Sequence, residues 1–94
     1  MTGVRCLAAK LDDEVNQGNL ENVMRLIEQG ADVNGRNVLR DTPLIAAAHT
    51  GQPNMVRLLL VWGADKSLLG FDGKTARERA EQVGHREVLL VLGE

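Results

Sequence analysis

The residue types that catalyse reactions or bind metal ions are few in this chain, and their spacing suits neither task. The two histidines, His49 and His85, have no second histidine or cysteine at the short separation that a zinc site requires. The single cysteine, Cys6, has only Arg5 as a cationic neighbour, which favours an inert apolar role over a reactive thiol. The sequence therefore predicts no catalytic residues, no metal site and no enzyme activity.

The acidic run Asp12–Glu14 and the ten glycines also lack the spacing of a ligand site. The run does not have the ligand positions of a calcium loop, and no stretch has the pattern of a phosphate-binding loop. No cofactor is predicted, and the acidic run is expected to face water. A net charge of −2 and the lack of a basic run argue against a nucleic acid partner. The longest apolar runs, such as residues 58–62, are far too short to span a membrane, so no membrane partner is expected.

The lone cysteine leaves no partner for an internal disulfide. The N-terminal residues carry one arginine and a short apolar patch before the acidic run, which is unlike a secretory signal peptide. An intracellular protein, cytoplasmic or nuclear, is therefore expected.

Glycines repeat along the chain with a period of 33 residues. Gly18, Gly51 and Gly84 keep this spacing, and the tripeptide Gly-Ala-Asp occurs at residues 30–32 and again at 63–65. A fixed period of this length is typical of a repeat array. The sequence predicts a single domain over residues 1–94, with repeats at approximately 4–36, 37–69 and 70–94.

Each repeat has the signals of two short helices. In the middle repeat, Thr42 and Pro43 are favoured residues for the start of a helix, and Gly51 is a favoured residue for its end. A second helix is expected between Pro53 and Gly63. The connectors at 32–41 and 65–74 are rich in residues that favour turns, and each is predicted to form a projecting finger.

The middle repeat, DTPLIAAAHTGQPNMVRLLLVWGAD, resembles an ankyrin repeat. The match extends to Gly18–Asn34 and to parts of the third repeat. The resemblance implies an all-α fold, an α-solenoid of three ankyrin-like helix-turn-helix repeats with projecting β-hairpin fingers.

Several residues depart from the family pattern. Ile45 stands where the family usually has His, which is expected to remove a hydrogen bond to Thr42, and Arg40 replaces the usual turn glycine. In the terminal repeats, Arg77 and Arg79 replace inward leucines, and residues 12–14 replace small apolar residues. Polar residues at these positions are expected to face water, as in the end repeats of an array.

The resemblance implies a non-enzymatic protein-binding module, acting as an adaptor or a competitive inhibitor. In ankyrin repeats the partner usually meets the finger tips and the inner face of the first helices. Exposed apolar residues on the fingers favour binding, whereas Leu68, Leu69 and Phe71 packed finger against finger would favour a structural role. The implied partner-binding residues are Val38, Leu39, Asp41, His49, Thr50, Leu69, Phe71, Asp72, Lys74, Gln82 and Val83, with Asn16 and Gln17 as an extension.

An assembly role is the alternative function. Val61 and Trp62 stand where the family has polar residues, so Trp62 either covers the stack or anchors self-association. Residues 34–66 carry a net charge of +2 between acidic ends, which suits the steering of an acidic peptide.

Asn34 is a candidate modification site. The segment from Leu26 to Asn34 resembles the sequence that an asparaginyl hydroxylase modifies in many ankyrin repeats, and the next repeat, which has Ser67 at this position, lacks the target. The alternative is that the Asn34 side chain stabilises its own turn.

Overall fold

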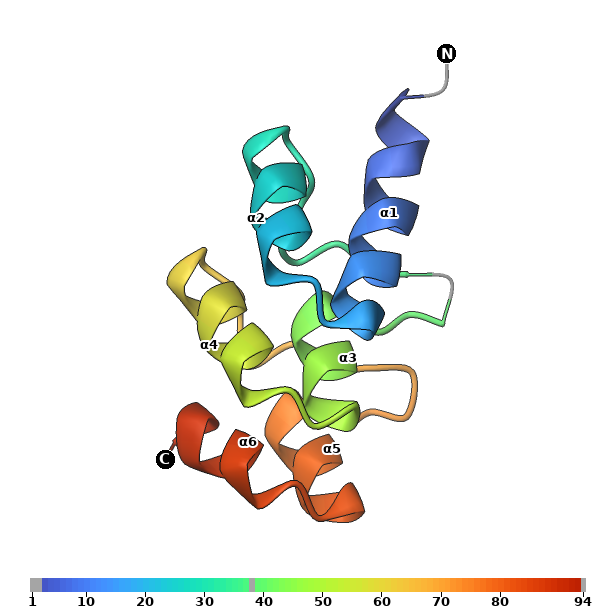
Figure 1. The fold of residues 1–94 in the computed structure, drawn as a ribbon. Helices are drawn as coiled ribbons and strands as arrows, with labels where there is room; N and C mark the ends of the chain where they lie inside the picture. Colours follow the sequence, from blue (N-terminus) through green and yellow to red (C-terminus); the bar gives the residue numbers. More distant parts are fainter. Residues whose placement is uncertain (1–2, 38, 94) are drawn as a thin grey trace.

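The computed structural model describes the backbone of residues 3–37 and 39–93 and the side chains of residues 10–37 and 39–93. Val38 and the side chain of Cys6 lie outside this part. The helices form two layers (Figure 1). One layer contains α1 (Gly3–Gln17), α3 (Pro43–His49) and α5 (Ala76–Val83), and the other contains α2 (Leu20–Glu28), α4 (Pro53–Val61) and α6 (Arg86–Leu92).

The helices stack as three antiparallel pairs, one pair to each repeat. Helix α3 packs against both α1 and α5, and α4 packs against α6. The middle repeat therefore has a neighbour on each side, which confirms the predicted all-helical stack (Figure 1).

Short-range sequence signals explain where the helices begin and end. The Thr42 hydroxyl accepts a hydrogen bond from the backbone N–H of Ile45 at 3.2 Å, so this cap does not need the histidine of the family pattern. In the third repeat, Thr75 and Glu78 form a capping box, in which each side chain binds the other residue's backbone N–H. Gly84 ends α5 with φ of 79°, a left-handed conformation that glycine adopts without steric cost.

The core is aliphatic and centres on the middle repeat. The small side chains of residues 46–48 in α3 are buried, which lets the longer side chains of α4 approach closely. The fully buried large side chains of the middle repeat are Leu44, Ile45, Met55, Val56 and Leu59.

None of the helices in the described part of the chain is long and apolar enough to span a bilayer.

The connectors form tight turns where β-hairpins were expected. No strand occurs among the described residues. In the first turn, residues 36–41, the N–H of Asn37 donates to the carbonyl of Asp41 at 3.0 Å. In the second turn, residues 69–74, the N–H of Gly70 donates to the carbonyl of Lys74 at 2.9 Å. Each turn closes over a few residues, so too little chain remains for paired strands.

Candidate binding surface

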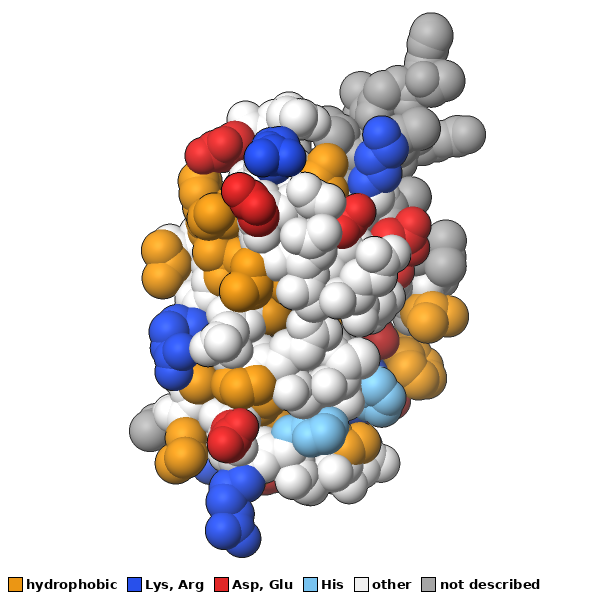
Figure 2. All heavy atoms as spheres, in the orientation of Figure 1, with side chains coloured by type: hydrophobic (Ala, Val, Ile, Leu, Met, Phe, Trp, Pro, Cys, Tyr) orange, Lys and Arg blue, Asp and Glu red, His pale blue; other side chains and the backbone are white. Residues whose placement is uncertain are grey.

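Apolar side chains are exposed on both turns, where the turns project beyond the layer of α1, α3 and α5 (Figure 1). Leu39 is 63% exposed, Leu69 47% and Phe71 65%. Figure 2 shows hydrophobic side chains gathered along this edge of the molecule. Leu68 is half-buried, whereas Leu69 and Phe71 are exposed. Of these three residues, Leu68 is therefore the one that packs inward.

A hollow of about 560 Å³ lies between the two turns. The guanidinium of Arg36 spans it, because Nη1 donates to the carbonyl oxygen of Arg40 at 2.8 Å and to that of Leu69 at 2.5 Å. These two hydrogen bonds hold the turns together and fix a positive charge between them. The hollow is lined by Arg36, Asn37, Arg40, Leu69, Gly70 and Phe71.

The Phe71 ring is held in place from its inner side. The guanidinium carbon of Arg79 lies 5.2 Å from the ring centroid, a distance at which a cation is attracted to an aromatic face. Phe71 remains 65% exposed, so it presents a fixed apolar surface to solvent.

Arg79 does not face water, which corrects the expectation for a terminal repeat. It is 5% exposed, and its guanidinium binds Asp41 through two hydrogen bonds of 3.1 and 3.3 Å. Its Nη2 also donates to Asp72 at 3.1 Å. Arg77 does face water, beside Glu81. A buried cation needs opposite charges nearby, and the two carboxylates supply them.

Asp41 therefore does not lie on the binding surface, in contrast to its predicted place there. It is 7% exposed, and its Oδ1 also accepts the N–H of Phe71 at 3.4 Å. Gly70 makes this arrangement possible, because a Cβ atom there would lie 2.5 Å from Asp41 Oδ1. Asp41 links the start of the second repeat to the second turn.

The ion pairs change the acidity of Asp72. Loss of hydration alone would raise the pKa of this carboxyl, but hydrogen bonds from Arg79 and from the N–H of Lys74, with the Arg79 charge, lower the pKa below its usual range. Asp72 is therefore ionised at neutral pH and is part of the ion-pair cluster.

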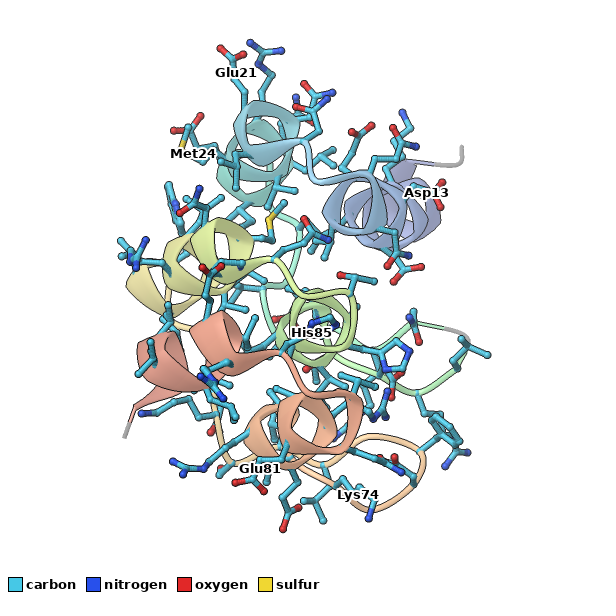
Figure 3. The ribbon with its side chains drawn as sticks, turned by 60° about the horizontal axis from the view of Figure 1, so that its bottom comes forward. Asp13, Glu21, Met24, Lys74, Glu81 and His85 are labelled. Atoms are coloured by element: carbon cyan, nitrogen blue, oxygen red, sulfur yellow. The ribbon has the colours of Figure 1, made fainter. Side chains whose placement is uncertain are left out.

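The remaining predicted residues lie at the other ends of α3 and α5, about 10 Å from the turns along each helix. His49, Gln82 and Val83 are exposed there. Thr50 is also exposed, but its hydroxyl donates to the carbonyl of Ala46 at 2.8 Å. Lys74 belongs to the second turn and points outward from it (Figure 3).

Equivalent polar side chains link neighbouring repeats. Gln52 Nε2 donates to the carbonyl of Val15 at 2.7 Å, and His85 Nε2 lies 3.1 Å from the carbonyl oxygen of His49. Gln52 and His85 are 33 residues apart, so each satisfies a carbonyl near the end of the preceding first helix. His85 therefore has a structural role. The 33-residue spacing between Gln52 and His85 is the sequence signal that could have predicted the same role for Gln52.

Asn34 also links two repeats. Its Oδ1 accepts a hydrogen bond from the backbone N–H of Asp65 at 2.8 Å, whereas its own turn is stabilised by Asp32, which accepts the N–H of Asn34 at 2.9 Å. The interpretation that the Asn34 side chain stabilises its own turn was therefore wrong. Modification of Asn34 stays a prediction.

Two neighbouring acidic residues of α1, Asp12 and Asp13, have different surroundings. Asp13 points away from the stack (Figure 3), whereas Asp12 is half-buried and accepts a hydrogen bond from Asn37 Nδ2 at 2.8 Å. Asp12 thus anchors the first turn to α1. In the described part of the chain, no three His, Cys, Asp or Glu side chains form a group that could hold a metal ion.

Comparison with known proteins settles the family. Residues 6–94 match the family model described as ankyrin repeats (3 copies). The chain belongs to the ankyrin repeat family. Ankyrin repeats are generally protein-interaction modules.

The matching curated relatives are much longer proteins. The chain is 39% identical over 83 residues to the ARF GTPase-activating protein GIT1 of Homo sapiens, and this match covers 87% of the chain and 11% of the relative. It is 46% identical over 79 residues to the E3 ubiquitin-protein ligase Ufd4 of Drosophila melanogaster, and this match covers 80% of the chain and 3% of the relative. The chain thus spans about a tenth or less of these relatives, whose names denote two different activities.

Proposed function

We propose that this ankyrin repeat chain is a non-enzymatic module that binds a protein or peptide partner. The partner contacts the two turns and the adjoining inner face of α1, α3 and α5, and the chain acts as an adaptor or as a competitive inhibitor. It works without a cofactor, a nucleic acid or a membrane, in the cytoplasm or the nucleus.

The exposed apolar side chains of the turns are the observation that supports this proposal. Leu39, Leu69 and Phe71 are exposed although each turn is anchored to a helix. Asn37 of the first turn binds Asp12 in α1, and Asp72 of the second turn binds Arg79 in α5. A surface that is already ordered loses little conformational entropy on binding, so more of the contact energy contributes to affinity. The stack therefore serves as a rigid support for the turns.

A capture experiment with matched variants tests the proposal. Wild-type protein, Leu39→Asp and Leu90→Asp are immobilised and exposed to lysate of the source cell. Leu90 is 75% exposed on α6, so its replacement makes the same kind of change outside the proposed surface. A partner should be retained by wild type and by Leu90→Asp and lost from Leu39→Asp.

Binding of the purified partner is then measured by calorimetry, where Leu39→Asp should weaken it roughly tenfold or more. Melting temperatures of all three proteins should agree within a few degrees. Equal binding by Leu39→Asp and wild type would remove the turns from the proposed surface.

Self-association is the second candidate, and a different group of exposed residues favours it. Val61 is 78% exposed and Trp62 37% at the end of α4, and hydrophobic side chains gather along α2, α4 and α6 in Figure 2. Sedimentation over a hundredfold range of concentration tests this role. A dimer that dissociates on Trp62→Ser would support assembly, and a monomer throughout would exclude it.

A further inference from the structure

Two arginines without carboxylate partners face the hollow between the turns. Arg36 and Arg40 are exposed, and neither forms an ion pair with the residues that the structure describes. Among the residues that the structure describes, Arg36 donates to carbonyl oxygens from Nη1 alone, which leaves Nη2 and Nε for a ligand. A guanidinium with free N–H groups of this kind suits a carboxylate ligand.

The other side of the hollow is apolar. Leu69 and the Phe71 ring line it, and Arg79 holds the ring from behind. The described residues place no acidic side chain in the lining of the hollow. The two turns together with Arg79 contain four basic and two acidic residues, a net charge of +2 within a chain whose net charge is −2. Positive charge is thus concentrated beside an exposed apolar surface.

From this juxtaposition we propose that the hollow binds a linear protein segment in which Asp or Glu stands next to a large apolar side chain. The carboxylate contacts Arg36 and Arg40, and the apolar side chain packs on Leu69 and Phe71. This inference rests on the proposed function and assigns the chemistry of the partner. Opposite charge increases the rate of encounter, and the apolar contact slows dissociation.

A random library of twelve-residue peptides displayed on phage tests the inference. Peptides selected on the wild-type protein should be enriched in Asp or Glu next to Leu, Phe or Trp. The affinity of a selected peptide is then measured by fluorescence polarisation, against Arg40→Gly, Phe71→Asp and the control Arg57→Gln. Arg57 is an exposed arginine on α4, outside the hollow, so its replacement removes the same charge elsewhere.

Arg40→Gly is suited to this test because Arg40 has φ of 70°, which glycine adopts more easily than arginine. The variant should bind the peptide roughly two- to fivefold more weakly, the usual range for one exposed ion pair. Arg57→Gln should bind within experimental error of wild type. The loss on Arg40→Gly should disappear when Asn or Gln replaces the peptide's acidic residue, because the two changes remove the same contact.

Affinity should also fall as salt is raised from about 0.05 to 0.5 M, where charges are screened over shorter distances. Selected peptides that depend on Phe71 but show neither an excess of acidic residues nor a loss on Arg40→Gly would overturn this inference and leave the proposed function intact. Failure to select any peptide would also overturn it, and the capture experiment would then judge the proposed function by itself.

Discussion

The two turns occupy equivalent places in the stack but are anchored by different chemistry. In the first turn, Asn37 Oδ1 accepts the N–H of Leu39 at 2.8 Å and that of Asp41 at 3.0 Å, and its amide donates to Asp12. In the second turn the equivalent residue is Gly70, which has no side chain to form such bonds. Arg79 of α5 anchors this turn instead, through its bonds to Asp41 and Asp72. The first turn relies on the Asn37 amide, which binds two amides of the turn and the Asp12 carboxylate in α1, whereas the second turn relies on the guanidinium of Arg79.

A substitution at one position explains much of this difference. The residue equivalent to Asp12 in the next repeat is Ile45, which is buried and has no group to receive a turn amide. Gly70 lies above it, and the space that a side chain would occupy is filled by Asp41 and Arg79. The geometry of an ankyrin turn is therefore compatible with more than one set of anchoring contacts.

The largest difference between the turns should appear on loss of Arg79. Arg79→Met leaves Asp41 buried without its counter-charge, and it should lower the free energy of unfolding by about 3–5 kcal/mol. Urea unfolding followed by circular dichroism measures this loss. The companion variant Asp41→Asn with Arg79→Met removes both charges and should recover part of the stability. A loss below about 1 kcal/mol for Arg79→Met would show that the cluster is solvated.

A pH titration gives an independent check on the same cluster. The pKa of Asp72 is lowered in the folded state, so its ionised form stabilises the fold above the unfolded pKa, about 3.9. This contribution is lost as the pH falls from about 4 through the folded pKa. Wild type should therefore lose stability more steeply in acid than Arg79→Met, which lacks the partner of Asp72.

The burial of Arg79 also shows where sequence reasoning failed. An arginine in place of an inward leucine was interpreted as a water-facing residue of an end repeat. Its partners are Asp72 in the preceding turn and Asp41, 38 residues away. Neither carboxylate is adjacent to Arg79 in sequence, and only the folded turn brings all three together. By contrast, the ends of α3 were predicted, because Thr42, Pro43 and Gly51 act on their immediate neighbours.

The candidate surface was predictable to a similar extent. Exposure of Leu39, Leu69 and Phe71 agrees with the unusual apolar content of the turns. The bridge made by Arg36 was not foreseen, because its acceptors are backbone carbonyls, which no residue type reveals. Contacts to backbone atoms and between distant charges are therefore the features that needed the structure.

Gly70→Ala should reveal the space that the ion pair needs. The added Cβ would lie 2.5 Å from Asp41 Oδ1 and 2.9 Å from Arg79 Nη2, so the ion pair must loosen. The expected loss is about 1–3 kcal/mol, as for other overpacked sites. Thermal unfolding measures it. In the Arg79→Met background the same change should cost less, and an equal cost would mean that Asp41 and the backbone alone create the conflict.

Asn37→Ala should weaken the first turn by a smaller amount. It removes the hydrogen bonds to two turn amides and to the Asp12 carboxylate, and a loss of about 1–2 kcal/mol is expected because the turn is partly hydrated. Asp12→Ala removes one of these bonds and should cost less. Hydrogen exchange should show faster opening of the first turn in both variants, with the second turn unchanged. Faster exchange in both turns would show that the turns are coupled.

The smallest effect should come from exchanging the turn residues Arg40 and Gly73. Both have positive φ, 70° for Arg40 and 75° for Gly73, a conformation that costs a non-glycine residue about 1–2 kcal/mol. Arg40→Gly should raise stability by about 0.5–1 kcal/mol, because glycine relieves this strain but makes the unfolded chain more flexible.

Gly73→Arg should lower stability by a similar amount. A Cβ at Gly73 meets no atom within 4 Å, so the effect should come from backbone strain and not from a clash. Differential scanning calorimetry of the two variants and of the double exchange decides the matter. If the backbone alone matters, the double exchange should melt close to wild type. If Arg40→Gly lowers the melting temperature instead, the Arg40 side chain stabilises the first turn by more than its strained backbone costs.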